Sequence, residues 1–214
     1  MSGVRDERPP GSVEGRLEAK RQRVLESARR HFMVGGFADT GIEAVAREAR
    51  VSTATLYDLF PGKTQLFHAV IEDAGAEFTR KISEVTAREP DLMDRLKTFA
   101  SAYARFMSDP FVRAVFRLVA AERRRFTPVA RGFYDRGRAD FGGILMQIII
   151  GLEKEGRLRA PRPSVAAGQL MGMIEHPTFL VPLVTGGEVE SSRTLEQVAA
   201  DALETFLARY GTDA

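Results

Sequence analysis

The segment Val51–Lys63, which reads VSTATLYDLFPGK, limits the possible folds more than any other stretch of the chain. Its central helix is only about two turns long, and so short a helix is not stable in water by itself. Leu56 and Phe60 form an apolar side that must pack against another part of the chain. The segment therefore predicts a braced helix whose outward residues are Ser52, Thr53, Thr55 and Tyr57.

A second short helix is predicted just before this one. Thr40 and Glu43 have the spacing of a capping box, in which the hydroxyl and the carboxylate satisfy each other's backbone N–H groups. Arg47 lies on the outward side of the helix that follows. A tight turn then leads to Ser52, which caps the next helix. Two short helices separated by three or four residues match the helix-turn-helix pattern.

The outward residues of the second helix suit contact with nucleic acid. Tyr57 can donate its phenol to a phosphate, and Lys63 adds a charge to a helix start whose N–H groups already favour anions. Such contacts position a protein, whereas Thr53 and Thr55 can offer methyl groups and hydroxyls to base edges. The plainer alternative is that Ser52 and Thr53 are ordinary capping residues and that Tyr57 belongs to the core.

The charge of the chain permits nucleic acid without requiring it. The 31 Lys and Arg residues exceed the 29 Asp and Glu residues by two, and the pI is near 9.1. Residues 16–63 contain nine basic and six acidic residues, an excess of three. The positive charge is therefore concentrated, weakly, around the predicted helix-turn-helix.

Composition also narrows the class of protein. There is no cysteine, which excludes disulfides and thiolate metal sites. No apolar run approaches the roughly 18 residues that span a bilayer, and the N-terminus has no segment of signal-peptide type. We expect a soluble, cytoplasmic, nucleoid-associated protein with no membrane partner, no metal site and no cofactor.

One long segment resembles the N-terminal DNA-binding domain of the TetR/AcrR family of bacterial transcriptional repressors, and it reads ARRHFMVGGFADTGIEAVAREARVSTATLYDLFPGKTQLFHAVI. The similarity extends without a gap over roughly Arg21–Glu72, and the string VSTATLY-x-x-F-x-x-K is highly specific. The resemblance implies a helix-turn-helix at residues 41–60. With Arg47 added for its outward position, the predicted DNA-binding residues are Thr40, Arg47, Ser52, Thr53, Thr55, Tyr57 and Lys63.

Arg50 departs from the family pattern, because glycine is common at this position of the turn. If the backbone there needs a positive φ, an arginine costs on the order of 1 kcal/mol. The same side chain would place another cation near a phosphate.

The remainder of the chain also reads as helices, since apolar residues recur at helical spacing and no segment alternates like a strand. Thr127 is expected to cap one helix, and Pro177 and Pro182 are expected to break or kink another. The expected helices cover residues 91–108, 109–125, 127–155, a stretch from 163, and 192–210.

We therefore predict an all-α fold with an N-terminal three-helix helix-turn-helix domain, a larger C-terminal helical bundle, and dimerisation. Residues 1–15 form a disordered arm, because they hold almost nothing to bury. Residues 16–63 form the DNA-binding domain. Residues 64–214 form the ligand-binding and dimerisation domain.

Two features of the C-terminal part suggest a dimer interface. Small residues permit close helix approach, and the last helix carries a long apolar stripe, so two copies of the last helices can form a four-helix contact. Two-fold DNA sites favour a dimer, whereas the alternative is that the stripe packs inside one chain. The predicted interface residues are Gly168, Gly172, Leu195, Val198, Ala199, Ala202, Leu203 and Phe206.

The C-terminal part holds more aromatic and methionine side chains than a tight aliphatic core needs. Such side chains can line a cavity for a flat or flexible apolar ligand, although each can also be ordinary core. His176 is a possible polar contact beside the kink at Pro177. The predicted pocket residues are Phe99, Tyr103, Phe106, Phe116, Phe133, Phe141, Met146, Met171, Met173, His176 and Phe179.

A looser resemblance links the C-terminal half to AefR-like members of the same family, and it rests on FRLVAAERRRFTPVARGFYDRGR and GLEKEGRLR. The leading hypothesis is a ligand-responsive repressor that binds a near-palindromic operator as a homodimer and is released by a small apolar or aromatic molecule. The alternatives are an all-helical enzyme or carrier without DNA binding, and an activator with the same DNA-binding head. Catalysis is not supported, because the three histidines are far apart and no phosphate-binding loop or metal-ligand spacing occurs.

Overall fold

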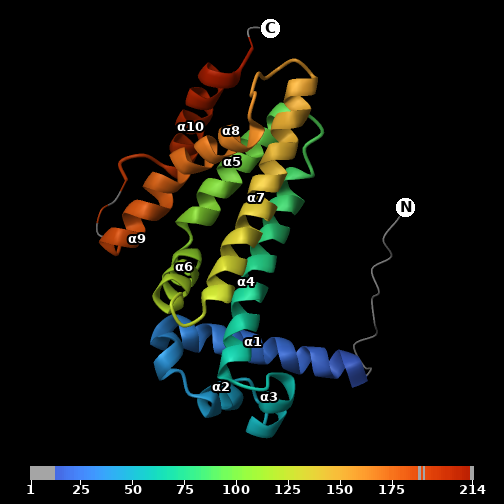
Figure 1. The fold of residues 1–214 in the computed structure, drawn as a ribbon, viewed down its shortest axis with the longest axis vertical. Coiled ribbons are helices and arrows are strands. Elements are labelled where there is room, and N and C mark those ends of the chain that lie inside the picture. Colours follow the sequence, from blue (N-terminus) through green and yellow to red (C-terminus); the bar gives the residue numbers. More distant parts are fainter. Residues whose placement is uncertain (1–12, 188, 190, 213–214) are drawn as a thin grey trace. The chain divides into compact units, whose positions relative to one another are not determined.

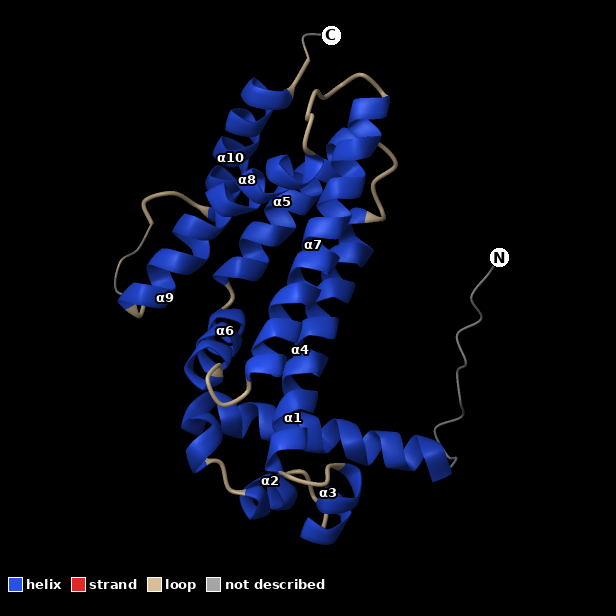
Figure 2. Ribbon diagram, in the orientation of Figure 1, coloured by secondary structure: helices blue, strands red, loops and turns tan. Residues whose placement is uncertain are grey.

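The computed structural model describes residues 13–187, 189 and 191–212, and of Phe78 and Val85 only the backbone. Most of the predicted arm at residues 1–15 lies outside the described residues. The all-α prediction is confirmed, since the described part of the chain consists of helices and loops without a strand (Figure 2). The first described helix begins at Val13, three residues before the start of the predicted DNA-binding domain.

Four helices make up the N-terminal part of the chain, from the blue helix onward in Figure 1. The helix α1 is interrupted at Gly36, whose φ of 69° and ψ of −171° are not helical. The regular helix that begins at Val13 therefore stops at Gly36. The helices are α1 (Val13–Asp39), α2 (Ile42–Glu48), α3 (Thr53–Leu59) and α4 (Lys63–Thr86).

The remaining helices follow the order that the sequence predicts. They are α5 (Leu92–Ser108), α6 (Pro110–Glu122), α7 (Thr127–Lys154), α8 (Pro163–Glu175), the π-helix η1 (His176–Leu180), α9 (Val181–Thr185) and α10 (Leu195–Tyr210).

The chain divides into two compact units, one that ends at Asp73 and one that begins at Ala74. The division falls inside α4, so packing assigns the first part of this helix to the N-terminal unit. The predicted boundary after Lys63 lies ten residues earlier.

A cluster of three aromatic rings forms the centre of the N-terminal unit. The ring of Phe32 stacks on Phe37 at 6.0 Å between centroids, and Phe67 meets both rings edge-on at 5.4 Å. All three side chains are buried. Since Phe67 belongs to α4, the cluster joins the two ends of the unit across the helix-turn-helix segment.

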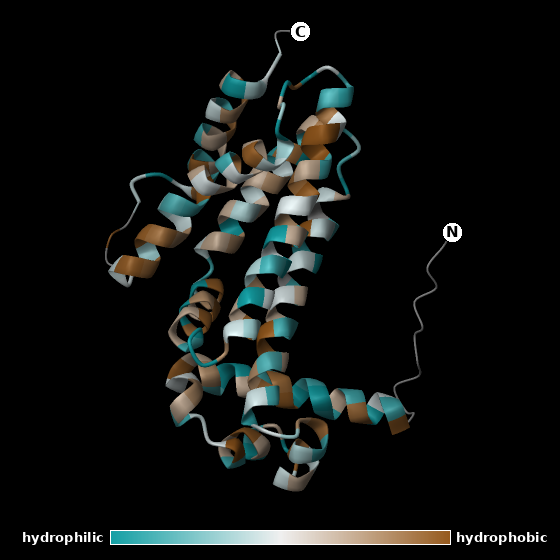
Figure 3. Cartoon of the chain, viewed as in Figure 1, coloured by the Kyte–Doolittle hydropathy of each residue, from teal (hydrophilic) through white to brown (hydrophobic). Residues whose placement is uncertain are grey.

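The C-terminal unit is held together by apolar faces of long helices. Figure 3 shows brown apolar and teal polar residues alternating along these helices, as expected of amphipathic helices. The helix α10 packs against α5 and α8, and α7 packs against α5 and α8. Phe99, Leu145 and Phe206 are among the fully buried side chains of this core.

The predicted break at Pro177 takes the form of a π-helix. The backbone stays helical through Pro177 and Pro182, and the N–H of Val181 bonds to the carbonyl of His176 five residues back. A widened turn accommodates a residue that lacks a backbone N–H and crowds the preceding turn. The expected kink is therefore a local change of helix type.

The cap predicted at Thr127 is wrong. Phe126 occupies the cap position, and the Thr127 hydroxyl donates to the carbonyl of Arg123 at 3.1 Å. The proline at position 128 still lies in the first turn, where its missing N–H costs nothing.

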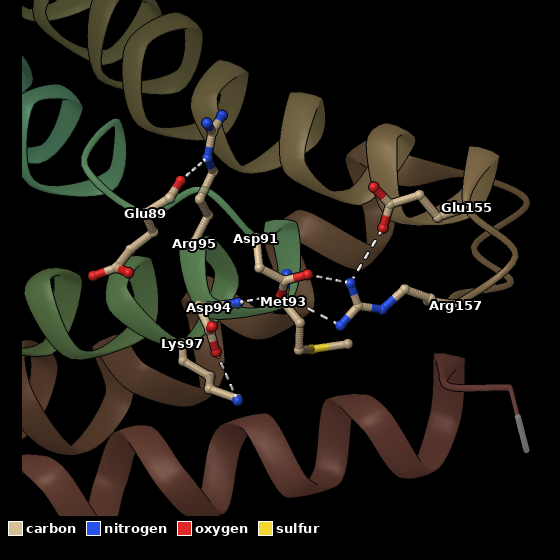
Figure 4. A network of polar contacts seen from close by, with 8 residues as sticks. All are labelled: Glu89, Asp91, Met93, Asp94, Arg95, Lys97, Glu155 and Arg157. Carbon is tan, nitrogen blue, oxygen red and sulfur yellow. Dashed lines mark hydrogen bonds and ion pairs between the residues drawn. The ribbon is translucent and has the colours of Figure 1, made fainter.

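Asp91 organises the start of α5 (Figure 4). Its carboxylate accepts the backbone N–H groups of Met93 at 2.8 Å and Asp94 at 3.1 Å, as a helix cap does. It also accepts both terminal nitrogens of Arg157, at 2.6 and 3.3 Å. The hydrogen bond from Arg157, followed by those from the backbone, lowers the pKa of Asp91 from 3.8 to about 2.

Replacing Asp91 by alanine is expected to lower Tm by a few degrees at neutral pH, because it removes the cap and the partner of Arg157. A carboxyl whose pKa is lowered by folding stabilises the folded state above its unfolded pKa. That contribution disappears as the pH falls through about 2. Thermal unfolding of both proteins between neutral pH and pH about 2 measures the difference.

Asp94→Ala is the matched control, because it removes a carboxylate from the same helical turn without removing the cap. A difference between the wild type and Asp91→Ala that stays constant down to pH about 2 would contradict the role of the ionised carboxylate.

Candidate nucleic-acid interface and effector site

As the sequence predicts, the helix α3 packs through an apolar side and presents polar residues at the surface. Leu56 and Phe60 are buried. The Ser52 hydroxyl accepts the backbone N–H of Thr55 at 3.1 Å, which confirms the cap. Ser52 and Thr53 are exposed, Thr55 is half-buried, and Tyr57 is 47% exposed. The end of α3 therefore presents hydroxyl groups and a phenol at the surface, and the alternative that Tyr57 belongs to the core is wrong.

The turn between α2 and α3 contains the strained arginine that the sequence indicates. Arg50 has a φ of 56°, and it is the one described residue other than glycine with a positive φ. Its N–H bonds to the carbonyl of Arg47 at 3.2 Å, and the N–H of Val51 bonds to that of Ala46 at 3.0 Å. These two bonds form a Schellman motif, in which glycine is the usual residue at the left-handed position.

Replacing Arg50 by glycine is expected to raise the free energy of unfolding by about 1 kcal/mol, because glycine adopts this φ without a Cβ clash. Urea denaturation measures the change. Arg50→Ala is the control, since it removes the same charge but keeps the Cβ. If both variants unfold at the same urea concentration, the strain is not stored at this residue.

Hydrogen bonds from α1 hold α2 in place. The Nε of Arg23 donates to the carbonyl of Ala49, and the buried hydroxyl of Ser27 donates to that of Val45, both at 3.1 Å. These carbonyls lie at the C-terminal end of α2, and that of Val45 also accepts the backbone N–H of Ala49 at 2.9 Å. The contacts orient the helix-turn-helix, and no sequence periodicity indicates them.

Glu48 adds an ion-pair link between the same two helices. Its carboxylate lies 2.7 Å from the Nε of Arg30 and 2.8 Å from the Nε2 of His31. The hydrogen bond from Arg30, followed by its charge and the contact with His31, lowers the pKa of Glu48. Arg30 and Glu48 are largely exposed, so this link orients the helices more than it stabilises them.

The capping box predicted at Thr40 and Glu43 is wrong. Gly41 is the cap residue of α2, and no side chain caps that helix. Thr40 is only 5% exposed, and its hydroxyl donates to the carbonyl of Gly36 at 2.7 Å. The hydroxyl thus satisfies a carbonyl at the break in α1, and a DNA contact from Thr40 stays a prediction.

Lys63 lies at the start of α4, as predicted, and already has partners inside the N-terminal unit. Its ammonium donates to the carbonyl of Ala38 at 2.8 Å and lies 4.9 Å from the centroid of the Phe37 ring. An ammonium has three donors, so the Ala38 bond leaves donors for a phosphate. Arg47 and Arg50 are exposed on α2 and in the turn.

The predicted pocket residues form two aromatic clusters in the C-terminal unit. In the first cluster, neighbouring rings of α5 and α7 lie 4.9 to 6.3 Å apart; its members are Phe99, Tyr103, Phe106 and Phe141. In the second, Phe116 of α6 meets Phe133 of α7 at 5.0 Å and Phe179 of η1 at 4.8 Å. Met146, Met171 and Met173 are half-buried, and His176 is exposed.

Tyr103 links the first cluster to a carboxylate that the sequence reasoning missed. The buried phenol donates a hydrogen bond to Glu175, the last residue of α8. Burial, with the nearby Glu175 charge, raises the pKa of Tyr103 above its ordinary value, so the phenol stays protonated. The two residues are 72 positions apart, and no pattern in the sequence pairs them.

The residues predicted for the dimer interface separate into two groups. Four side chains of α10 are at most 4% exposed and lie within one protomer: Val198, Ala199, Ala202 and Phe206. The apolar stripe of α10 therefore packs inside the chain, which is the alternative stated above. These four side chains are not accessible to a partner. Gly168 and Gly172 are exposed on α8, and Leu195 and Leu203 are half-buried.

The described residues hold neither a candidate metal site nor a candidate membrane-spanning helix. No group of three or more His, Cys, Asp or Glu side chains among them is placed to hold a metal ion. None of their helices combines the length and the apolar character that a membrane crossing requires.

A surface helix-turn-helix joined to a larger helical unit defines the class of helix-turn-helix transcriptional regulators. The protein-family model for the AefR-like transcriptional repressor C-terminal domain matches residues 94–212, more than half of the chain. The model of the tetR family of bacterial regulatory proteins matches residues 24–70. The chain belongs to the TetR family of bacterial transcriptional regulators, with a C-terminal domain of the AefR-like type.

Individual relatives agree with this assignment. The chain is 27% identical to the nucleoid occlusion factor SlmA of Haemophilus influenzae over 210 residues, 92% of each chain. The structure of a TetR-family regulator from Mesorhizobium loti has a TM-score of 0.80 at 24% identity, over 92% of this chain and 99% of that one. The flavonoid-responsive regulator FrrA has a TM-score of 0.70 at 27% identity, over 92% and 100%. The family consists of regulators and not of enzymes.

Proposed function

We propose that this regulator is a ligand-responsive repressor that binds a near-palindromic operator as a homodimer. The observation that carries the proposal is the exposed end of α3, where Ser52, Thr53 and Tyr57 stand on a braced helix. Arg47 and Lys63 add positive charge on either side of that helix in the sequence. In this arrangement Tyr57, Arg47 and Lys63 contact phosphates, and Thr53 and Thr55 read base edges.

The dimer supplies the two recognition helices that a palindromic site requires. The two half-sites of such an operator lie about 34 Å apart, which is one helical turn of DNA. With the inner stripe of α10 buried, the interface forms from the outer faces of α8 and α10. Gly168 and Gly172 permit close approach there, because a Cβ at either position would meet nothing within 4 Å in the protomer.

The effector is a small apolar or aromatic molecule that binds at the two aromatic clusters of the C-terminal unit. The comparison protein FrrA is named for its response to flavonoids, which are aromatic. A ligand that favours the released state by about 2–3 kcal/mol lowers operator affinity about a hundredfold. A change of a few ångströms in the spacing of the recognition helices is enough to misfit the half-sites.

Selection of bound duplexes from a random pool tests the proposal, because the operator sequence and the half-site spacing emerge together. We expect a near-palindrome and binding that weakens with salt. Binding without sequence preference, or none at all, ends the proposal. The position of the operator relative to the promoter separates a repressor from an activator.

Replacing Lys63 by alanine is expected to weaken binding to all duplexes alike and to reduce the salt slope by about one, because one phosphate contact is lost. Fluorescence anisotropy at several salt concentrations measures the slope. Lys154→Ala is the control, since this exposed lysine lies at the end of α7. If the slope stays unchanged in Lys63→Ala, the lysine serves only its bond to Ala38.

A further inference from the structure

Glu175 is a half-buried carboxylate of the C-terminal unit. It ends α8 and accepts the hydrogen bond from Tyr103. Among the residues that the structure describes, no Lys, Arg or His lies within ion-pairing distance of its carboxylate. A carboxylate that loses water on burial needs opposite charge or several hydrogen bonds. One bond from a phenol meets only part of that need.

Three aromatic rings lie around the ring of Tyr103, whose hydroxyl bonds to this carboxylate. The ring of Tyr103 lies 5.5 Å from Phe99, 5.9 Å from Phe141 and 6.3 Å from Phe106, centroid to centroid. Aromatic faces attract cations through their quadrupoles, most strongly where water is excluded. Phe106 and Glu175 are both half-buried, so each keeps part of its surface accessible to solvent in the protomer.

The carboxylate of Glu175 and the rings of the first cluster together determine which charge a bound ligand must carry. An uncharged apolar molecule would cover Glu175 and remove its remaining water without replacing it, which costs free energy. An anion would be repelled. A molecule with an ammonium group and an aromatic or apolar body would neutralise the carboxylate and place its charge against the rings.

We propose that the first aromatic cluster and Glu175 form a binding site for organic cations, with an aromatic or apolar body and an ammonium group that pairs with Glu175. Tyr103 is a positioning residue, because its protonated phenol donates to Glu175 and orients the carboxylate. This inference rests on the proposed function in one respect, namely that the cation is the effector.

The test compares two probes of the same shape, benzyltrimethylammonium and its uncharged carbon isostere neopentylbenzene. Ligand-observed NMR titration of the full chain gives both affinities. We expect the wild type to bind the cation at least about tenfold more tightly than the isostere. Equal affinities, or a preference for the isostere, overturn the proposal.

Glu175→Gln keeps the shape of the side chain and removes its charge, so the preference for the cation is expected to disappear. Glu204→Gln, which removes an exposed carboxylate of α10, is expected to leave the preference unchanged. If Glu175→Gln folds poorly, Phe106→Leu provides a second measurement. We expect it to weaken binding of the cation more than binding of the isostere. A preference that persists in Glu175→Gln, or that Phe106→Leu leaves undiminished, in a folded protein assigns the cation to another place and overturns the proposal.

Operator binding in the presence of benzyltrimethylammonium separates this inference from the proposed function. If the cation binds with the expected dependence on Glu175 but operator affinity stays unchanged, the cation site stands and its role as effector site fails. If an uncharged aromatic molecule releases the operator and the cation does not bind, the repressor proposal stands and the cation site fails.

Discussion

Replacing Phe32 by alanine is expected to lower the free energy of unfolding of the N-terminal unit by about 3–5 kcal/mol, and to abolish binding to DNA at ordinary temperature. Phe32 is fully buried, and its ring contacts both Phe37 and Phe67. Domains of this size are stable by only about 5–15 kcal/mol, with small ones at the low end. A loss of this size is expected to unfold much of the N-terminal unit, against which α3 packs.

Circular dichroism during urea unfolding and duplex anisotropy measure the two effects. Val34→Ala is the matched control, because this side chain is 91% exposed on the same helix. Its effect on stability is expected to stay within about 0.5 kcal/mol. A Phe32→Ala protein that unfolds like the wild type would show that the aromatic cluster does not carry the unit.

Replacing Phe206 by alanine is expected to have a comparable effect on the C-terminal unit. Phe206 is almost fully buried on α10, which packs against α5, and its ring lies 5.1 Å from that of Tyr210. The cavity left behind costs about 3–5 kcal/mol and lowers Tm on the order of 10 °C. Thermal unfolding measures the shift.

Tyr134→Ala is the control for this variant, since it truncates an aromatic ring that is 65% exposed on α7. Its Tm is expected to stay close to that of the wild type. If Phe206→Ala keeps the wild-type Tm, the apolar stripe of α10 is not part of the core and is available to a partner after all.

The sequence predicted the helices well, because helical spacing of apolar residues is a local property. The helix expected from Asp91 to Ser108 is α5, with Asp91 as its cap. The helix expected to end before Gly156 is α7, which ends at Lys154. The strain at Arg50 was also indicated, because the resemblance places glycine at this position of the turn and Arg50 has a positive φ there.

Capping shows where local reasoning fails. The pattern of a threonine followed three residues later by Glu or Gln occurs at both Thr40 and Thr194. A capping box forms with Gln197 at the start of α10, where Thr194 is exposed. At Thr40 the break in α1 places the carbonyl of Gly36 within reach, and the buried hydroxyl bonds to it. A tertiary contact thus decides between two uses of one residue pattern.

By itself, the sequence determined the all-α class, the order of the helices, and the apolar and hydroxyl sides of α3, because each follows from residues within a few turns of one another. Tertiary structure alone decided that the stripe of α10 packs inside the protomer, that Lys63 bonds to Ala38, and that Tyr103 meets Glu175. Periodicity shows which face of a helix is apolar but not which surface covers it. Pairs 25 and 72 residues apart depend on how the helices pack, which no local pattern encodes.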